Sequence, residues 1–342
     1  MKSILLTGTA GFIGSNFVPY FLKKYPDYQL VNLDLLTYAG NLENLKECEE
    51  NERYKFIQGD ICNRELVEFI FREYNIEGVI HFAAESHVDN SIKNPGVFVE
   101  TNVNGTFTLL DVAYKHWMQK PFVKKKGYEE SRFHHISTDE VYGTLSDDPE
   151  DLFTEKTPYA PNSPYSASKA SSDMIVRSYV ETYGMNCVIT NCSNNYGPKQ
   201  HDEKLIPTII RNALAGNPIP IYGDGKNIRD WLYVLDHCKG IDLVYHNGDK
   251  GETYNIGGRN ERTNLQIVDA ICTILDEKVP PKERIGKESY KELVTFVEDR
   301  AGHDRRYAID ATKIENELGW RADETFDTGI VKTVEWYLNK YL

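Results

Sequence analysis

Paired cysteines are missing from this sequence. Its six cysteines occupy positions 48, 62, 187, 192, 238 and 272, with no CxxC spacing and no dense framework. This distribution argues against a disulfide-stapled secreted fold and favours reduced thiols. The nine histidines show no metal-ligand spacing such as HxxxH, so we predict no metal site.

The sequence also lacks a long apolar run. No stretch approaches the roughly 18 apolar residues that a membrane-spanning helix needs, and the first residues indicate a strand rather than a signal peptide. We therefore expect a cytoplasmic protein without a membrane partner. A net charge of −13 also argues against binding to nucleic acid. It does not exclude an anionic small ligand, because local arginines and helix N-termini can bind one.

Alternating strand and helix patterns fill the first half of the chain. The expected strands are nearly continuous in apolar character, as when helices cover both faces of a parallel sheet. They lie at 3–8, 30–34, 56–60, 78–84, 133–138 and 187–192, with helical patterns at 12–25, 64–74, 97–116 and 164–183. The alternation predicts an α/β fold built on a Rossmann-type, doubly wound parallel sheet.

The pattern changes after residue 196, where proline and glycine become frequent. Helical segments are expected near 204–215, 264–276, 312–318 and 326–340, separated by loops. With 342 residues the chain can hold a large domain and a smaller one. We predict a Rossmann domain over 1–195, to which the chain returns around 230–255, and a smaller mixed α/β C-terminal lobe from 196–229 and 256–342.

Three spaced glycines follow the first expected strand. In LLTGTAGFIGS (5–15), Gly8, Gly11 and Gly14 precede the first expected helix. Glycines there permit a tight turn and close approach of a pyrophosphate to backbone N–H groups. Asp34 ends the next strand 20 residues after Gly14; it suits the ribose hydroxyls of NAD and would repel the extra phosphate of NADP. Asp60, ending the third strand, is a candidate partner for the adenine. A purely structural glycine turn is the alternative.

A tyrosine and a lysine lie four residues apart in SPYSASK (163–169). Tyr165 and Lys169 would therefore project from one face of a helix. A free tyrosine titrates near ~10, so a tyrosine that acts as a base near neutrality needs a shift of roughly 2–3 units. A nearby ammonium and a positive nicotinamide can supply that shift. An ordinary amphipathic helix with an exposed lysine is the alternative.

Two neighbouring acids, Asp139 and Glu140, follow Ser137 and Thr138 in HHISTDEVYGT (134–144). Adjacent carboxylates repel each other, and charge at the end of a buried strand is costly. Repulsion and desolvation oppose double ionisation and push the two titrations apart, so that one group can stay protonated while the other is ionised. Two solvated loop acids are the alternative.

Together, the spaced glycines and the Tyr165–Lys169 pair resemble the extended short-chain dehydrogenase/reductase superfamily. Segments along the whole chain resemble one family within it, the dTDP-glucose 4,6-dehydratases: AAESHVDNSI, HISTDEVYG, SPYSASKASSD, TNCSNNYGP, EKLIP, PIYGDGKNIRDWLYV, TYNIGG and DRAGHDRRYAID. Thr9 departs from the pattern, because the family often carries another glycine there, but the three spaced glycines remain.

The resemblance implies a three-stage reaction on dTDP-glucose. Hydride leaves C4 for NAD+ while Tyr165 takes the hydroxyl proton and Thr138 holds that oxygen. Water is then eliminated across C5 and C6, with Glu140 as the base at C5 and Asp139 as the acid for the C6 hydroxyl. The hydride finally returns to C6, which gives the 4-keto-6-deoxy sugar, a step toward deoxysugars such as rhamnose. Because NAD+ is regenerated each turnover, the resemblance also implies a tightly retained cofactor.

The family pattern implies the following site residues, with the nucleotide sugar bound by the C-terminal lobe. Catalytic positions are Thr138, Asp139, Glu140, Tyr165 and Lys169. NAD positions are Gly8, Gly11, Phe12, Ile13, Gly14, Asp34, Leu35, Leu36, Thr37, Asp60, Ile61, Phe82, Ala83, Ala84, Ser86, Thr101, Tyr165, Lys169 and Asn195. Substrate positions are Ser86, Thr138, Asn194, Lys204, Leu205, Pro220, Ile221, Tyr222, Arg229, Asn264, Tyr307 and the 299–303 segment with Asp299 and His303.

Arg229 is the best candidate for the substrate diphosphate, because its guanidinium fork lies in the glycine-rich stretch GDGKNIRDW. A salt bridge to Asp230 or Asp236 is the alternative. By analogy with the family we expect a homodimer, formed through the helices at 97–116 and 164–183.

Two rival functions share part of this pattern. A nucleotide-sugar 4-epimerase or related decarboxylase would use the same Tyr–Lys pair and NAD, but needs no acid–base pair for C5 and C6. A 4,6-dehydratase acting on another NDP-glucose also stays open, because no residue by itself demands a thymine. A non-catalytic NAD-binding regulator of the same fold would be free to lose these groups, whereas this chain has all of them.

Overall fold

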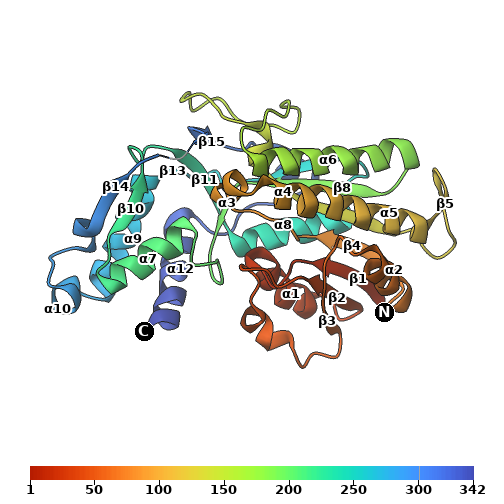
Figure 1. Ribbon diagram of the computed structural model, residues 1–342, viewed down its shortest axis with the longest axis horizontal. Coiled ribbons are helices and arrows are strands. Elements are labelled where there is room, and N and C mark those ends of the chain that lie inside the picture. The colour runs from red at the N-terminus through yellow and green to blue at the C-terminus, as the bar shows by residue number, and fades with distance from the viewer. Residues whose placement is uncertain (300) are drawn as a thin grey trace.

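A seven-stranded parallel sheet organises the larger part of the molecule (Figure 1). The computed structural model describes residues 1–299 and 301–342. The strand order is β12-β8-β7-β4-β1-β2-β3, and every neighbouring pair is parallel. The strands are β1 (Lys2–Thr7), β2 (Tyr28–Asp34), β3 (Tyr54–Gln58), β4 (Ile76–His81), β7 (Arg132–Thr138), β8 (Cys187–Cys192) and β12 (Thr253–Ile256).

Helices cover both faces of this sheet, which explains the continuous apolar strands. Leu5 packs on one face with α2 (Arg64–Glu73), α5 (Thr106–Trp117) and α6 (Pro164–Tyr183). Its neighbours Ile4 and Leu6 pack on the other face with α1 (Phe12–Lys24) and α8 (Val234–Asn247). Because successive strand residues point to opposite faces, a strand covered on both sides must be apolar throughout. The predicted Rossmann-type α/β fold is confirmed.

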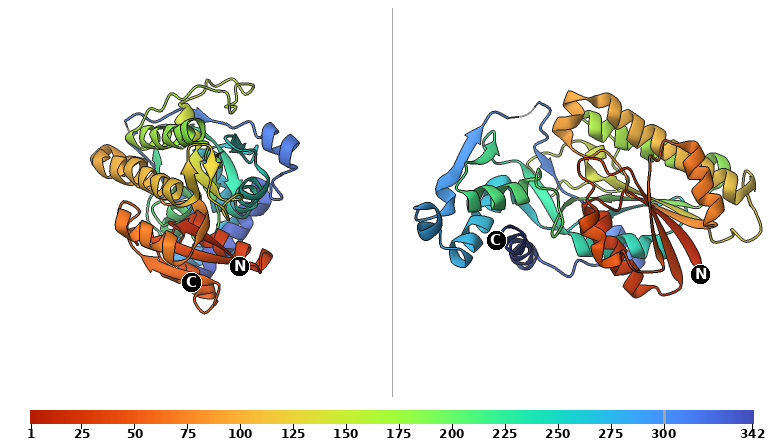
Figure 2. Two further views of the ribbon diagram at one scale, coloured as in Figure 1. Left: turned by 90° about the vertical axis from the view of Figure 1, so that its right-hand side faces the viewer. Right: turned by 60° about the horizontal axis from the view of Figure 1, so that its bottom comes forward.

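The C-terminal lobe has its own hydrophobic core. The helices α7 (Leu205–Ala215), α9 (Asn264–Lys278) and α12 (Phe326–Tyr341) contribute Ile210, Ile271 and Val334 to it. Short strands complete the lobe: β10 (Ile219–Tyr222) pairs with β14 (Val294–Val297), while β11 (Ile228–Tyr233) pairs with β9 (Asn194–Tyr196), β13 (Glu261–Thr263) and β15 (Arg306–Tyr307). The right-hand view of Figure 2 shows the lobe at one end of the molecule, beside the sheet domain. The predicted domain limits stay a prediction.

The helix expected at 97–116 is built from three differently wound parts. They are α4 (Pro95–Phe98), a π-helix η2 (Val99–Gly105) and α5. The Thr106 hydroxyl donates to the Asn102 carbonyl at 2.6 Å, an acceptor that a regular α-helix would reserve for its own backbone. The Asn102 side chain donates to the Ser168 hydroxyl at 2.8 Å and so links this helix to α6.

The remaining elements are short. They are η1 (Leu42–Cys48), α3 (Val88–Lys93), β5 (Met118–Lys120), β6 (Val123–Lys124), η3 (Asp139–Tyr142), α10 (Pro281–Ile285), η4 (Tyr290–Leu293) and α11 (Thr312–Leu318). Within the described residues, every helix is too short or too polar to cross a bilayer.

Candidate active site

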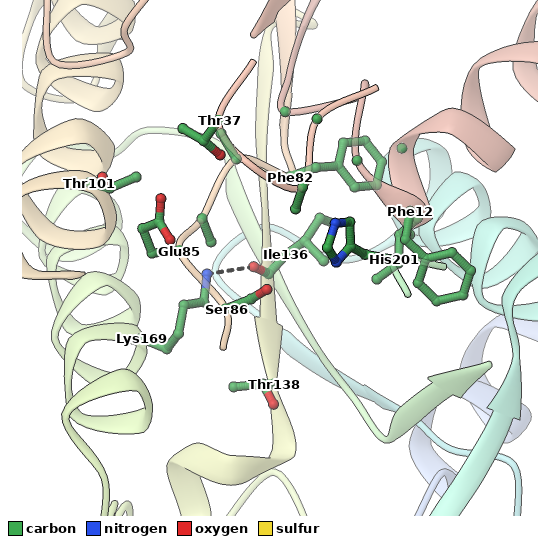
Figure 3. Close-up of a pocket in the computed structure, with 18 of the residues that line it drawn as sticks. Phe12, Thr37, Phe82, Glu85, Ser86, Thr101, Ile136, Thr138, Lys169 and His201 are labelled. Carbon is green, nitrogen blue, oxygen red and sulfur yellow. Dashed lines mark hydrogen bonds between the residues drawn. The ribbon is translucent and has the colours of Figure 1, made fainter. Parts of the chain in front are cut away.

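A cleft of about 330 Å³ opens at the carboxyl ends of the parallel strands. In open α/β sheets this edge is where ligands bind. Residues that directly follow β1, β2, β3, β4 and β7 line it, which brings together side chains far apart in the sequence (Figure 3). All five predicted catalytic residues line the cleft, and so do all predicted NAD positions except Leu36.

The glycine turn after β1 can take only glycine at two of its positions. Gly8 has a φ of +71°, and a β-carbon there would lie 2.5 Å from Ala83 Cα. A β-carbon on Gly14 would overlap Thr9 Cα, so this glycine lets α1 pack closely on the turn. No acidic residue occupies the first turn of α1. The N-terminus of this helix therefore suits the pyrophosphate of a dinucleotide.

Asp34 is fixed at the end of β2. Its carboxylate accepts hydrogen bonds from the Ala10 amide at 2.8 Å and from the Leu36 amide at 2.9 Å. Burial raises the pKa of this carboxyl. Leu36 thus orients Asp34 through its backbone and does not itself line the cleft. Asp60 lines the cleft from the end of β3, and its carboxylate accepts from the Cys62 amide at 2.8 Å. These positions fit an adenosine half of NAD.

Tyr165 and Lys169 project from the first turns of α6, which begins with a Ser163 capping box and Pro164. Both are almost fully buried, at 8% and 3% exposure. The Lys169 ammonium donates to the Ile136 carbonyl of β7 at 2.8 Å, the contact dashed in Figure 3. Burial lowers the pKa of Lys169 to about 8.

Among the protein's own groups, burial dominates the titration of Tyr165. Burial and then the charge of Glu140 raise the pKa of Tyr165 well above its usual value, while a hydrogen bond with Thr138 lowers it. The sequence had indicated a nearby ammonium as the group that would lower it. In the structure Lys169 lies deeper than Tyr165, against β7. Desolvation by burial is the largest effect on the pKa of Tyr165, and it raises that pKa.

The neighbouring acids occupy different environments within η3. Asp139 is 1% exposed, and its Oδ2 has no hydrogen-bond partner among the described residues. Burial, then the charges of Glu140 and Asp230, raise the pKa of Asp139 well above its usual value. Glu140 is only half-buried, and its amide donates to the Thr138 hydroxyl at 3.3 Å. Asp139 is therefore the acid that keeps its proton.

Arg229 lies in β11, close to this acid. Its charge lowers the pKa of Asp139, against the larger effect of burial. The guanidinium stacks on the Tyr307 ring at 4.1 Å and donates to the backbone carbonyls of Ile228 and Asp304 at 2.7 and 2.9 Å. Asp230 instead accepts from the backbone of Gly258 and Asn260, and Asp236 pairs with Lys239.

The predicted substrate positions divide between the cleft and the lobe. Ser86, Thr138, Asn194 and Lys204 line the cleft. The others lie outside its lining: Leu205, Pro220, Ile221, Tyr222, Arg229, Asn264, Asp299, His303 and Tyr307. Ile221 packs in the lobe core, whereas Tyr222 is exposed beside His303, which contacts Asp299 at 2.6 Å. Arg300, within the predicted 299–303 segment, lies outside the described residues.

Several cleft residues were not predicted from the sequence. Glu85 and Ser193 lie within motifs already quoted, beside Ser86 and Asn194, and this adjacency was an available signal. Glu203 begins the quoted motif EKLIP, beside Lys204, whereas Gln200 and His201 belong to the part of the connection between β9 and α7 where no residue pattern indicates a ligand. Within the described residues, no group of three or more His, Cys, Asp or Glu side chains could hold a metal ion.

Comparisons with known proteins agree along the whole chain. A family model described as GDP-mannose 4,6 dehydratase matches residues 5–333. A dTDP-glucose 4,6-dehydratase of Salmonella typhimurium is 56% identical over 342 residues, covering 98% of this chain and 92% of that protein.

Two solved structures are similar as well. One is a dTDP-glucose 4,6-dehydratase from Bacillus anthracis in complex with NAD, with a TM-score of 0.85 and 46% identity over 99% of this chain and 97% of that chain. The other is DesIV, a dTDP-glucose 4,6-dehydratase from Streptomyces venezuelae with NAD and TYD bound, with a TM-score of 0.86 and 44% identity over 98% of this chain and 97% of that chain.

Proposed function

The chain belongs to the nucleotide-sugar 4,6-dehydratase family that this model and these relatives define, and from that premise we propose that it is an NAD-dependent dTDP-glucose 4,6-dehydratase. It oxidises C4 of dTDP-glucose, eliminates water across C5 and C6, and reduces C6 to give dTDP-4-keto-6-deoxy-glucose. It is thus a hydro-lyase that uses NAD.

One observation carries this proposal: a fully buried acid, whose pKa burial raises, lies beside a half-buried one in the cleft that also holds Tyr165 and Lys169. An epimerase needs the tyrosine and the lysine but has no use for a proton donor at C6. The pairing of Asp139 with Glu140 supports dehydration specifically.

Residues along the glycine turn and the strand ends would hold NAD. Gly8, Gly11 and the N-terminus of α1 suit the pyrophosphate, and Asp34 suits the adenosine ribose. When bound, NAD supplies a hydride acceptor that later becomes the donor, together with a positively charged nicotinamide. The same Asp34 carboxylate would repel the extra phosphate of NADP, which supports the preference for NAD.

Tyr165 acts as the base for the C4 hydroxyl. Thr138 shares a hydrogen bond with it and can hold the same substrate oxygen. Lys169 contributes a buried positive charge on the same helix face, which favours the phenolate over the phenol. Burial raises the pKa of Tyr165, so the positive charges of Lys169 and of the nicotinamide have to lower it against this effect.

Asp139 and Glu140 divide the elimination between them. Once C4 is a ketone, the C5 proton is acidic enough for a carboxylate base, which we assign to Glu140. The leaving C6 hydroxyl needs a proton, and Asp139 is the residue held protonated by burial. Arg229, stacked on Tyr307 and close enough to influence Asp139, is the proposed anchor for the diphosphate of the substrate.

A mass-resolved turnover assay tests the function. The purified protein is incubated separately with dTDP-, UDP- and CDP-glucose, with and without added NAD. We expect a product lighter by one water, formed fastest from dTDP-glucose, with at least partial activity when no NAD is added. A product with galactose configuration and unchanged mass would instead identify an epimerase. If activity depended strictly on added NAD, and NAD were released after each turnover, this would contradict the prediction that the cofactor is retained.

We propose a homodimer formed by α5 and α6, which lie side by side on the outer face of the sheet (Figure 1). Large apolar side chains on or next to these helices are exposed: Val97, Val99, Phe107 and Met174. Light scattering should give a dimer mass for the wild type. The double change Phe107→Glu and Met174→Glu should give a monomer. The control is Phe296→Glu, which changes an exposed residue of the lobe and should leave the dimer intact.

We also propose a cytoplasmic location. All six cysteines are free thiols in the structure, five of them buried, which suits a reducing compartment.

A further inference from the structure

Asp173 continues the line of functional side chains down α6. It follows Lys169 by four residues and Tyr165 by eight, so all three lie along one face of the helix. It is the last residue of SPYSASKASSD and is 1% exposed. It does not line the cleft, so the reaction as described gives it no role.

The Asp173 carboxylate is held by donors from two other segments. Oδ2 accepts hydrogen bonds from the Ser137 hydroxyl at 2.8 Å and from the Tyr159 hydroxyl at 3.0 Å. Oδ1 lies 3.1 Å from His135 Nε2, on β7. The two hydrogen bonds on Oδ2 favour the ionised carboxylate, whereas Oδ1 has no hydrogen-bond partner among the described residues.

His135 connects Asp173 to the catalytic lysine. Its Nε2 lies 3.4 Å from Lys169 Nζ and 3.2 Å from the Ser172 hydroxyl. Burial lowers the pKa of His135 well below its usual value, and it does the same for His81 of β4, whose ring lies next to that of His135 at a tilt of 40°. Both histidines are therefore neutral near pH 7 and cannot balance the charge of an acid.

The other titratable groups facing Asp173 are also neutral near pH 7. Burial raises the pKa of Tyr142 on η3 and of Tyr159 in the loop before α6. The pKa of Asp173 itself is raised by burial to about 6, with hydrogen bonds from Ser137 and Tyr159 opposing the rise. Around Lys169, the charge of Asp173 is the main effect that favours the ammonium against burial.

We propose that Asp173 is a positioning residue of the active site: across the His135 ring nitrogen that both groups contact, the charge of its carboxylate keeps Lys169 as an ammonium near Tyr165, and so sets the pH range in which Tyr165 can act as a base. The role of Tyr165 rests on the proposed function, whereas the arrangement of Asp173, His135 and Lys169 does not. Removing the carboxylate charge should leave Lys169 neutral near pH 7 and the Tyr165 phenolate less stable.

A titration that needs no substrate tests this directly. The near-ultraviolet tyrosinate absorbance of NAD-loaded wild-type protein is measured against pH, and the curve of Tyr165→Phe is subtracted to isolate Tyr165. The same pair is then compared in an Asp173→Asn background. We expect the midpoint of Tyr165 ionisation to rise by about one pH unit, as when one neighbouring charge is lost from a buried site. An unchanged midpoint in folded Asp173→Asn protein would overturn the proposal.

Turnover of dTDP-glucose gives a second readout. In Asp173→Asn the acid limb of the kcat profile should move to higher pH, because Tyr165 is harder to ionise. The basic limb should move to lower pH, because Lys169 loses its proton sooner. A merely structural role would lower the folded fraction and leave both limbs in place. If wild-type protein fails to dehydrate the sugar, the proposed function fails, while the tyrosinate titration still decides the role of Asp173.

Two further variants guard against a folding defect. Asp242→Asn is the matched control. Asp242, on α8, is also an acid with 1% exposure, and it pairs with Lys24 of α1 and with His246 of its own helix. It should lower stability without moving the Tyr165 midpoint. If Asp173→Asn does not fold, Tyr159→Phe decides, because it removes one hydrogen bond that favours ionised Asp173. A smaller upward shift of the Tyr165 midpoint is then expected, and no shift would overturn the proposal.

Discussion

At the scale of single residues, burial separates two neighbouring acids. Both line the cleft, but Asp139 is almost fully buried with one unsatisfied oxygen, whereas Glu140 is only half-buried. A buried carboxyl without a partner is far cheaper to keep neutral than charged. The folding of the strand end thus gives two chemically similar side chains unequal tendencies to keep a proton, as the proposed acid and base roles require.

We predict that conservative changes to these acids will separate the steps of the reaction. Asp139→Asn cannot protonate the C6 hydroxyl, and Glu140→Gln cannot remove the C5 proton. Each should lower the rate of water loss roughly 10²–10⁴-fold, the usual contribution of a positioned acid or base. Oxidation at C4 should survive better, so reduced cofactor should accumulate in single-turnover absorbance measurements.

Asp148→Asn is the control, because the same chemical change then falls on an exposed loop outside the cleft. NAD binding should be unaffected in all three variants. Equal loss of C4 oxidation and of water loss in Asp139→Asn would contradict the assignment of this residue to the elimination.

At the scale of elements, sequence patterns predicted the parts whose signal is local. The first six strands of the main sheet and the helix over 164–183 were predicted within a few residues, because burial on both faces leaves long apolar runs. The edge strand β12 and the lobe strands are only two to six residues long and depend on pairing with distant segments, so no local pattern marks them. Helix α8 was missed because polar residues such as Asp236 and His237 are buried in it.

The same difference between local patterns and contacts with distant segments explains which residues of the site could be predicted. Motif residues at the strand ends lie together because parallel strands end at one edge, and the family resemblance had implied most of them. Gln200 and His201 reach the cleft only through the course of a connecting segment, 199–204, which tertiary contacts fix. Lys199 anchors one end of this segment, and Asp202 anchors it to α12.

These anchors predict a role for the 199–204 segment in keeping NAD bound. Lys199 Nζ donates to the Asn44 carbonyl at 2.8 Å and to the Ser15 carbonyl at 3.2 Å, next to the glycine turn. The Tyr341 hydroxyl of α12 donates to Asp202 at 2.7 Å. A hydrogen bond from a charged group contributes about 1.5–3 kcal/mol. Lys199→Ala should therefore release NAD roughly tenfold faster, measured by the loss of cofactor on rapid dilution and gel filtration.

Lys313→Ala is a matched control. Lys313 is similarly covered and also bonds a backbone carbonyl, that of Thr253, and a glutamate, Glu252, but it lies outside the cleft. It should leave NAD release unchanged. Equal release rates in Lys199→Ala and wild type would show that the 199–204 segment does not limit cofactor escape.

At the scale of the whole molecule, the core contains an unusual number of buried histidines. Burial lowers the pKa of His81, His134, His135 and His237, so the folded protein keeps all four neutral. In the unfolded chain each would bind a proton below about pH 6.5. Each of these residues therefore favours the unfolded chain as the pH falls through that value.

Buried acids with raised pKa values act in the opposite direction, Asp34 and Asp230 among them. Asp139 and Asp173 have raised pKa values, so they hold protons in the folded protein at pH values where the unfolded chain is ionised. In the unfolded chain the four histidines bind protons as the pH falls from about 6.5 to 5.5. We therefore expect the free energy of unfolding to fall over this pH range, by about 1.4 kcal/mol per pH unit for each net proton that the unfolded chain binds in excess of the folded protein.

Chemical denaturation at a series of pH values measures this slope. His134→Gln should flatten it by about one proton, since His134 contacts only Thr190 in the hydrogen-bond network and lies away from the catalytic groups. As the pH falls, the free energy of unfolding of His134→Gln should rise relative to that of the wild type, even if it is lower than that of the wild type at pH 7. A wild-type unfolding free energy that stays constant down to pH 5.5 would show that the buried histidines take up protons without unfolding, and would contradict their neutral burial in the sheet.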